Sequence, residues 1–224
     1  MSSIFKYYSD RKFFFDVFES KSLYFNTFKN YNDPIEKYAF FTAEEDGSSY
    51  TIYPEMKLHR CSTCCFSTSN LNYLLWSYYG KNHKGFCLEI NLDKYIEASE
   101  DTNIQSIQLN DEKIFGFSVI YECHSPLFSR NKLLKNAMTT EQFIEFSRYK
   151  YPFWRYEKEF RLLSLSEGPI KIKIPKDAIK GVTYGLETNK KDIEYIDSKL
   201  TEIGFNIRRQ KITTFDTYTG QLVI

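Results

Sequence analysis

The chain has 224 residues, which is enough for one substantial core, and 18% of them are aromatic, which excludes a disordered chain. Its 30 basic and 29 acidic side chains leave a net charge of +1, which excludes a protein built around non-specific binding to duplex nucleic acid. No apolar run has the length of a membrane span, and the first residues lack the pattern of a secretory signal. Because the 5 cysteines are an odd number, we expect free thiols and a cytoplasmic location.

The first half of the sequence predicts strands and helices separated by polar turns. Asp10 can cap a helix, because its carboxylate can accept hydrogen bonds from the first turn, and Phe14, Val17 and Phe18 then share an apolar face. The expected elements are a strand at 4–8, the helix after Asp10, a strand at 23–25, a helix starting near Pro34, a loop at 44–53, a buried strand at 61–68 and a helix at 71–78 that ends at Gly80.

The second half is again a mixture of strands and helices. The expected elements are a strand at 85–90, a polar connection, a strand at 114–121, a helix at 139–149, a strand through 154–161, a strand at 170–175, strands at 182–184 and 205–207 flanking a helix at 191–203 that stops at Gly204, and strands at 212–215 and 222–224. Since strands and helices do not alternate strictly, we predict a single α+β domain over 1–224 with a mixed or antiparallel sheet.

A charged segment at 154–161 is the most informative stretch of the sequence. Interpreted as a strand, it alternates between an aromatic face and a charged face. The aromatic face holds Trp154, Tyr156, Phe160 and Leu162, interrupted by Lys158, and the charged face holds Arg155, Glu157, Glu159 and Arg161. Neighbouring carboxylates raise each other's pKa and nearby arginines lower it, so the row could prepare one glutamate for chemistry. It could equally be a salt-bridged face exposed to solvent.

Other motifs narrow the function classes. The 9 glycines form no phosphate-binding loop, which argues against kinases, P-loop NTPases and Rossmann dehydrogenases. His59, Cys61, Cys64 and Cys65 lie close together, but no second Cys pair follows, so buried thiols are favoured and no metal is expected. Trp76 and Tyr79 have helical spacing, which is typical of a core and would also suit stacking against a planar ligand.

An ordered set of short motifs resembles a mostly bacterial family known as domain of unknown function number 2971. The motifs are Phe5-Lys6-Tyr7, Asn32-Asp33-Pro34-Ile35-Glu36, Cys65-Phe66-Ser67, Trp76-x-x-Tyr79, His83-Lys84-Gly85-Phe86 and Trp154-x-x-Glu157-x-Glu159-Phe160-Arg161. The resemblance extends over 4–185, and we expect the strand-helix-strand segment 186–224 to pack against that region. It implies no activity, but it implies a setting in phage defence or toxin systems, with a possible partner protein from the same operon.

A second resemblance is to ADP-ribosyltransferases of the Arg-Ser-Glu type, which carry a basic residue on a first strand, Ser-Thr-Ser on a second and Glu-x-Glu on a later one. The matching positions are Lys6 or Arg11, Ser67-Thr68-Ser69 and Glu157-Lys158-Glu159. The resemblance implies that Glu159 stabilises an oxocarbenium-like transition state, that Glu157 orients or deprotonates the acceptor, and that NAD is the substrate. The expected NAD-binding residues are Lys6, Tyr7, Asn32, Phe66, Ser67, Trp76, Tyr79, Trp154 and Arg161. The sequence departs from that type in having no arginine within the first strand.

Three function classes therefore stay open. The first is an NAD-consuming transferase or glycohydrolase that modifies a protein or nucleic-acid target. The second is a non-catalytic module that recognises proteins, for which abundant Tyr and Phe and a near-zero net charge are suitable. The third is a nuclease in which Glu157 and Glu159, together with Asp33 or Glu36, bind Mg²⁺.

Overall fold

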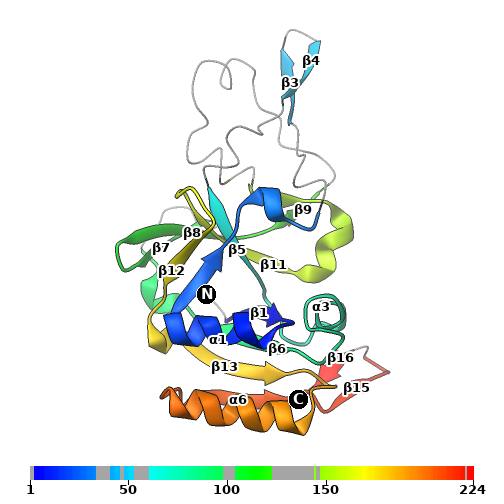
Figure 1. Cartoon of the computed structure of the whole chain (residues 1–224). Helices are drawn as coiled ribbons and strands as arrows, with labels where there is room; N and C mark the ends of the chain where they lie inside the picture. The colour runs from blue at the N-terminus through cyan, green and yellow to red at the C-terminus, as the bar shows by residue number, and fades with distance from the viewer. Residues whose placement is uncertain are drawn as a thin grey trace.

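A mixed sheet of eight strands, in the order β14-β13-β6-β1-β5-β11-β8-β7, organises the chain (Figure 1). The computed structural model describes residues 3–33, 41–45, 48–52, 61–97, 104–122, 144, 147–219 and 221–224. Within the sheet, β13 and β14 run parallel and the other neighbours run antiparallel. The predicted α+β class with a mixed sheet is thus confirmed, and no helix among the described residues combines the length and apolar character needed to cross a membrane.

The strands of the large sheet are β1 (Ile4–Tyr8), β5 (Ser62–Ser67), β6 (Phe86–Ile90), β7 (Ile104–Leu109), β8 (Glu112–Ser118), β11 (Glu159–Ser164), β13 (Ile179–Tyr184) and β14 (Arg208–Lys211). Four two-stranded sheets accompany it: β2 (Ser22–Phe25) with β12 (Ile170–Lys173), β3 (Phe41–Glu45) with β4 (Ser48–Ile52), β9 (Ile120–Tyr121) with β10 (Tyr149–Lys150), and β15 (Thr214–Asp216) with β16 (Gln221–Val223). The α-helices are α1 (Arg11–Ser20), α3 (Tyr73–Tyr78) and α6 (Lys190–Glu202), and the 3₁₀ turns are η1 (Phe28–Asn30), η3 (Asp93–Tyr95), η4 (Pro152–Glu157) and η5 (Lys176–Ala178).

The large sheet is split between its two central strands. β1 pairs with β6 from Ile4 to Tyr8, and β5 pairs with β11 along its whole length. Between β1 and β5, however, the register holds one residue pair, Phe5 with Ser67. Figure 1 shows β5 and β11 running obliquely to β1, β6 and β13. The half formed by β1, β6, β13 and β14 therefore diverges from the half formed by β5, β11, β8 and β7.

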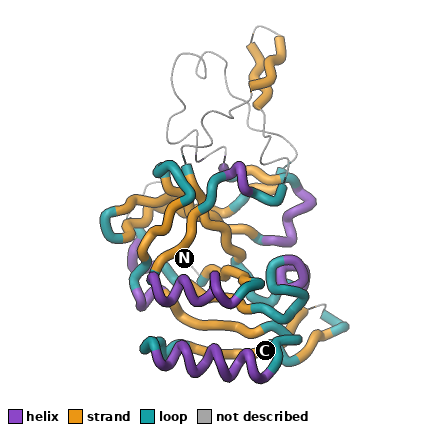
Figure 2. Tube along the Cα trace, in the orientation of Figure 1, coloured by secondary structure: helices purple, strands orange, loops and turns teal. Residues whose placement is uncertain are grey.

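Helices cover the two faces of the sheet unequally, as the tube in Figure 2 shows. On one face, the buried aromatic side chains of α1 and the apolar side chains of α6 join the main core, which extends over both halves of the sheet. Asp10 begins α1 by accepting the backbone N–H of Lys12, as predicted. On the other face, Trp76 of α3 packs with Cys87 and with Ile212 and Leu222 near the C-terminus.

Several predicted elements need correction. Residues 152–157 form the 3₁₀ turn η4, because Pro152 sets its first dihedral, and Lys158 takes a left-handed conformation (φ 45°), so the strand begins only at Glu159. The predicted loop at 44–53 contains parts of the β3–β4 hairpin, and the predicted polar connection contains β7.

The other differences concern the positions of elements. The strand expected at 205–207 is displaced to β14, and the strand expected at 114–121 is divided into β8 and β9. The left-handed Gly204 (φ 79°) follows α6, as predicted. The predicted helix near Pro34 and most of the one at 139–149 lie outside the described residues.

Candidate functional site

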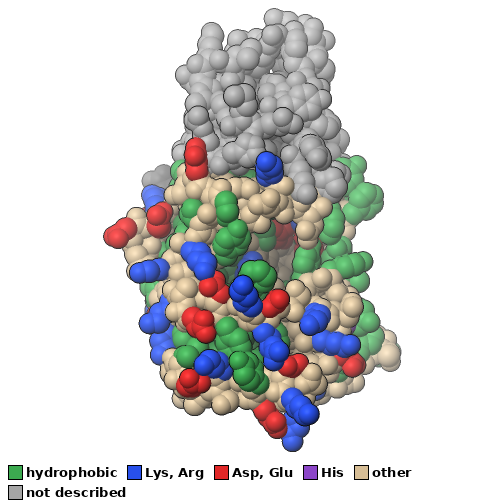
Figure 3. Space-filling view, viewed as in Figure 1, with side chains coloured by type: hydrophobic (Ala, Val, Ile, Leu, Met, Phe, Trp, Pro, Cys, Tyr) green, Lys and Arg blue, Asp and Glu red, His purple; other side chains and the backbone are tan. Residues whose placement is uncertain are grey.

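A pocket of about 830 Å³ lies at the split between β1 and β5. Its wall comes from segments far apart in the sequence: β1, α1, β2, η1 and the residues after it, β5, the end of α3, η4 with the preceding β10, and single residues of β11 and β12. Figure 3 shows this face of the molecule hollowed, with hydrophobic side chains around the opening. Its size and partly apolar lining are typical of sites for small organic ligands.

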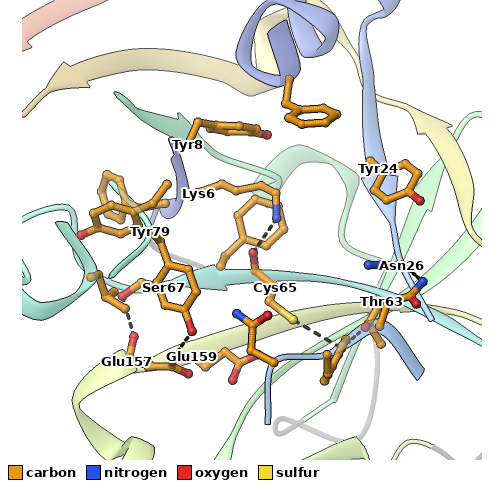
Figure 4. A pocket seen from close by; sticks show the side chains of 18 of the residues that line it. Lys6, Tyr8, Tyr24, Asn26, Thr63, Cys65, Ser67, Tyr79, Glu157 and Glu159 are labelled. Carbon is orange, nitrogen blue, oxygen red and sulfur yellow. Dashed lines mark hydrogen bonds between the residues drawn. The ribbon is translucent and has the colours of Figure 1, made fainter. Parts of the chain in front are cut away.

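The two glutamates of the charged segment meet at one end of this pocket (Figure 4). Glu159 begins β11 and pairs directly with Ser67 of β5, so the two side chains lie on the same face of the sheet. Glu157 ends η4, and its carbonyl accepts a hydrogen bond of 2.7 Å from the Ser67 hydroxyl. Each glutamate is 5% exposed, which excludes the prediction of a charged face open to solvent for this pair.

Two buried cations hold the carboxylates in place. The Arg161 guanidinium donates to both oxygens of Glu159, through Nε at 2.8 Å and Nη2 at 3.1 Å. The Lys150 ammonium donates to Glu157 at 2.6 Å and to Glu159 at 3.1 Å, and it lies over the Trp154 ring. Lys150 therefore bridges the pair, and the four groups together are electrically balanced.

The pKa values of the two carboxyl groups are shifted in opposite directions. Burial by itself raises the pKa of Glu159, but the charges of Arg161 and Lys150 outweigh burial and lower this pKa to about 2, so Glu159 stays ionised. Burial raises the pKa of Glu157, and the negative charge of Glu159 raises it further, against the opposing effect of Lys150. The Tyr79 hydroxyl donates to Glu157 at 2.8 Å. One end of the pocket thus holds a fixed anion next to a carboxyl group that takes up protons more readily than usual.

A single lysine from β1 also lines the pocket. The Lys6 ammonium donates to the Cys65 carbonyl at 3.0 Å and lies 5.4 Å from the centre of the Phe66 ring. Arg11, the other basic residue predicted for this role, pairs with Asp192 at 3.0 Å and does not line the pocket. The basic side chain on the first strand is therefore Lys6, a point charge with no planar fork for phosphate.

Most of the predicted ligand-binding residues line the pocket, but two do not. Those that do are Lys6, Tyr7, Asn32, Phe66, Ser67, Tyr79 and Trp154. Trp76 is completely buried, donates its indole N–H to the Asn70 carbonyl and packs edge-on against Tyr7. The prediction that Trp76 stacks on a ligand is therefore wrong, because α3 turns this side chain into the core. Arg161 is likewise completely buried; it donates to Glu159 and lies over the ring of Tyr31, and both of these residues line the pocket.

Of the charged row in the predicted strand, only Glu159 and Arg161 lie on a strand. Because η4 replaces the strand before Lys158, Arg155 does not join the row and instead donates to the Tyr121 carbonyl. Lys150 takes the place in the network that was expected for Arg155. No local pattern around Lys150 indicated this role, since β9 and β10 bring it to the glutamates through tertiary pairing.

The cysteines show no sign of a metal centre within the described part of the chain. Cys61 and Cys64 are buried, and burial raises the pKa of the Cys61 thiol to about 12, which keeps it protonated. Among the described residues, no three His, Cys, Asp or Glu side chains gather where they could hold an ion. His59, considered with the cysteines, and Glu36, considered for a nuclease, lie outside these residues.

Comparison with known proteins finds a resemblance to a family over one segment of the chain. Residues 75–162 match the family described as "Protein of unknown function (DUF2971)", which confirms the resemblance over this segment and over less of the chain than the motifs suggested. The matched segment contains Tyr79, Lys150, Glu157, Glu159 and Arg161. No curated protein and no solved structure matches the chain.

Proposed function

We propose that the protein binds NAD in this pocket and breaks the bond between nicotinamide and ribose, passing ADP-ribose to an acceptor or to water. The observation that carries the proposal is the pairing of Glu159 with Ser67 on neighbouring strands, at the end of a pocket that Lys6 also lines. The basic, serine and glutamate positions that resemble an ADP-ribosyltransferase come from β1, β5 and β11, which are consecutive strands of the sheet.

The charges suit a reaction in which positive charge develops on a sugar. As the bond between ribose C1′ and the nicotinamide nitrogen breaks, its electron pair leaves with nicotinamide and C1′ gains oxocarbenium character. Glu159, which is ionised at neutral pH, stabilises that charge. The lone pair of the acceptor oxygen or nitrogen then forms the new bond to C1′, and Glu157 takes the proton that the acceptor loses.

The remaining wall of the pocket fits the other parts of the substrate. Trp154 and Tyr79 line the end that contains the glutamates and offer aromatic surface for the nicotinamide ring. Lys6 lies next along the pocket, where its ammonium can bind a pyrophosphate oxygen. Buried carboxylates held by buried cations are also preorganised, because they cannot reorient during the reaction.

The test is direct. Purified protein is incubated with NAD, with and without a cell extract, and free nicotinamide is measured by chromatography. Release of nicotinamide should disappear in both Glu159→Gln and Glu157→Gln and persist in the control Glu167→Gln, whose side chain is exposed and outside the pocket. Because Glu159→Gln disturbs a buried ion pair, each variant is first shown to be folded by its thermal transition. Equal nicotinamide release by all folded variants, or none by the parent protein, rejects the proposal.

A second candidate function, recognition of a partner protein without catalysis, is favoured by the aromatic surface outside the pocket. Phe153 is 81% exposed and packs against Tyr151, and Tyr78 is 67% exposed and contacts Tyr156. Such aromatic side chains are typical of interface centres. This function predicts that NAD leaves the thermal transition unchanged, whereas binding of NAD would raise it. A setting in phage defence or a toxin system remains a prediction for either function.

A further inference from the structure

The pocket continues from the glutamates along β5 to a second polar end. Thr63, Cys65 and Ser67 alternate on one side of this strand, and all three line the pocket. Ser67 lies at the end with the glutamates, and Thr63 lies four residues away, about 13 Å along the strand. Figure 4 shows the same arrangement, with Glu157, Glu159 and Ser67 at one end, Tyr24, Asn26 and Thr63 at the other, and Lys6 between them.

Two asparagines of the second end have amide groups whose orientations are fixed. The backbones of Asn26 and Thr63 exchange both hydrogen bonds at 2.8 Å, which attaches Asn26 to β5. The Asn26 side-chain oxygen accepts the backbone N–H of Thr27 at 3.0 Å, so this amide cannot be turned over. The same oxygen accepts the Asn30 side-chain nitrogen at 2.8 Å, which fixes the Asn30 amide as well.

This arrangement leaves one donor and one acceptor on two neighbouring amide groups. With its oxygen occupied, Asn26 presents its NH₂ group, and Asn30 presents its carbonyl oxygen. Among the described residues, neither atom has a protein partner, and both side chains line the pocket. A ligand that binds here gains most if it carries an acceptor next to a donor on one planar edge.

The same end offers aromatic surface for a planar ligand. Phe13 of α1 and Tyr24 of β2 both line the pocket, and they are 65% and 46% exposed, so their rings are available for stacking. Large aromatic side chains left exposed along a pocket are a binding surface of the kind that nucleobases use. Stacking alone does not distinguish one base from another, whereas the two amide groups do.

We propose that Asn26, Asn30, Phe13 and Tyr24 form a subsite for adenine, which makes the pocket specific for an adenine dinucleotide. The proposal rests on the proposed function, since the adenine would be that of NAD. Adenine carries its amino donor between two ring-nitrogen acceptors, so both of its polar edges complement the amide pair. Guanine presents two acceptors on one edge, and on the other its acceptor and donor follow in the reverse order, so guanine matches the amide pair only with its ring turned over. The distance along β5 and the position of Lys6 leave a place for the pyrophosphate between the two nucleoside halves.

Binding of nucleoside diphosphates without nicotinamide tests the subsite separately from catalysis. Affinities for ADP and GDP are measured by calorimetry on the full chain, the variant Asn30→Ala and the control Asn206→Ala, whose exposed side chain lies on the connection to the far edge strand β14. The parent chain and the control should bind ADP at least about tenfold more tightly than GDP, and Asn30→Ala should lose about tenfold in ADP affinity with little change for GDP. Tyr24→Ala should weaken both ligands.

The outcomes separate the subsite from the proposed reaction. Equal affinity for ADP and GDP, absence of ADP binding, or an unchanged affinity of Asn30→Ala for ADP overturns the adenine subsite, even if NAD is cleaved. Selective ADP binding that depends on Asn30, in a protein that releases no nicotinamide from NAD, supports the subsite and overturns the reaction. Cleavage of the guanine analogue of NAD at the same rate as NAD also counts against the subsite.

Discussion

Replacing Glu159 by glutamine should destabilise the folded protein by about 3 to 5 kcal/mol, because it leaves buried cations without their anion. The structure gives the magnitude by a second route. The pKa of Glu159 falls from the ordinary value of 4.5 to about 2. That difference corresponds to about 3 kcal/mol of preference for the ionised carboxylate in the folded state. The destabilisation arises mainly at Arg161, because this guanidinium is completely buried and two of its nitrogens would lose their carboxylate partner. Its third nitrogen, Nη1, donates to the Ser147 carbonyl.

Glu157→Gln provides the contrast. Since the pKa of Glu157 is raised, the folded state already disfavours its ionised form, and an uncharged side chain of the same shape should change stability by less than about 1 kcal/mol. The assay is urea unfolding at pH 7, followed by tryptophan fluorescence, with the exposed Glu167→Gln as the surface control. Similar losses of stability in Glu159→Gln and Glu157→Gln would refute the assignment of the fixed anion to Glu159.

Two further predictions concern acid and backbone packing. The pKa of Glu159 is lower in the folded chain than in the unfolded chain, so the ionised carboxylate contributes fully to stability above pH 4.5 and this contribution is lost as the pH falls toward about 2. Urea titrations in this range should therefore show an unfolding free energy that declines more steeply with falling pH for the parent chain than for Glu159→Gln. Gly85→Ala should lower the unfolding free energy by more than about 2 kcal/mol, because the new methyl group would lie 2.3 Å from the Tyr8 carbonyl oxygen. The methyl group of Gly204→Ala would meet only the end of the flexible Lys176 side chain, at 3.4 Å, and the substitution should cost only about 1 kcal/mol for its positive φ, so equal melting temperatures of the two alanine variants would contradict this account.

The elements that could be predicted from the sequence are those whose signals are local. Asp10 and the aromatic spacing after it determine α1, and Gly204 marks the end of α6. The segment at 154–158 was misassigned because its residues alternate in polarity, whereas Pro152 and the left-handed Lys158 determine its backbone. Alternation in a short run does not distinguish a strand from a tight turn followed by a strand.

The composition of the candidate site was only partly predictable for the same reason. Glu157, Glu159 and Ser67 stood out as a short motif and a tripeptide, and the structure brings them together in one pocket. Lys150 and Asn26 carry no local signal, since their positions depend on pairing between segments far apart in the chain. Trp76 and Tyr79 are three residues apart, but one enters the core and the other the pocket, because α3 ends at Tyr78.

The single contact between Phe5 and Ser67 has a consequence for how this architecture can be altered. The two sides of the pocket belong to separately paired sets of strands, β1 with β6 and β5 with β11. Side chains on one side can therefore be exchanged without breaking the backbone hydrogen bonds of the strands on the other side. The split between β1 and β5 is held together by packed side chains of the shared core. Side-chain packing constrains the relative position of the two halves of the sheet less strictly than a strand register does. A protein engineer could therefore widen or narrow the pocket by resizing Phe66 or Tyr8, two buried residues that line it, while the paired strands on both sides keep their register.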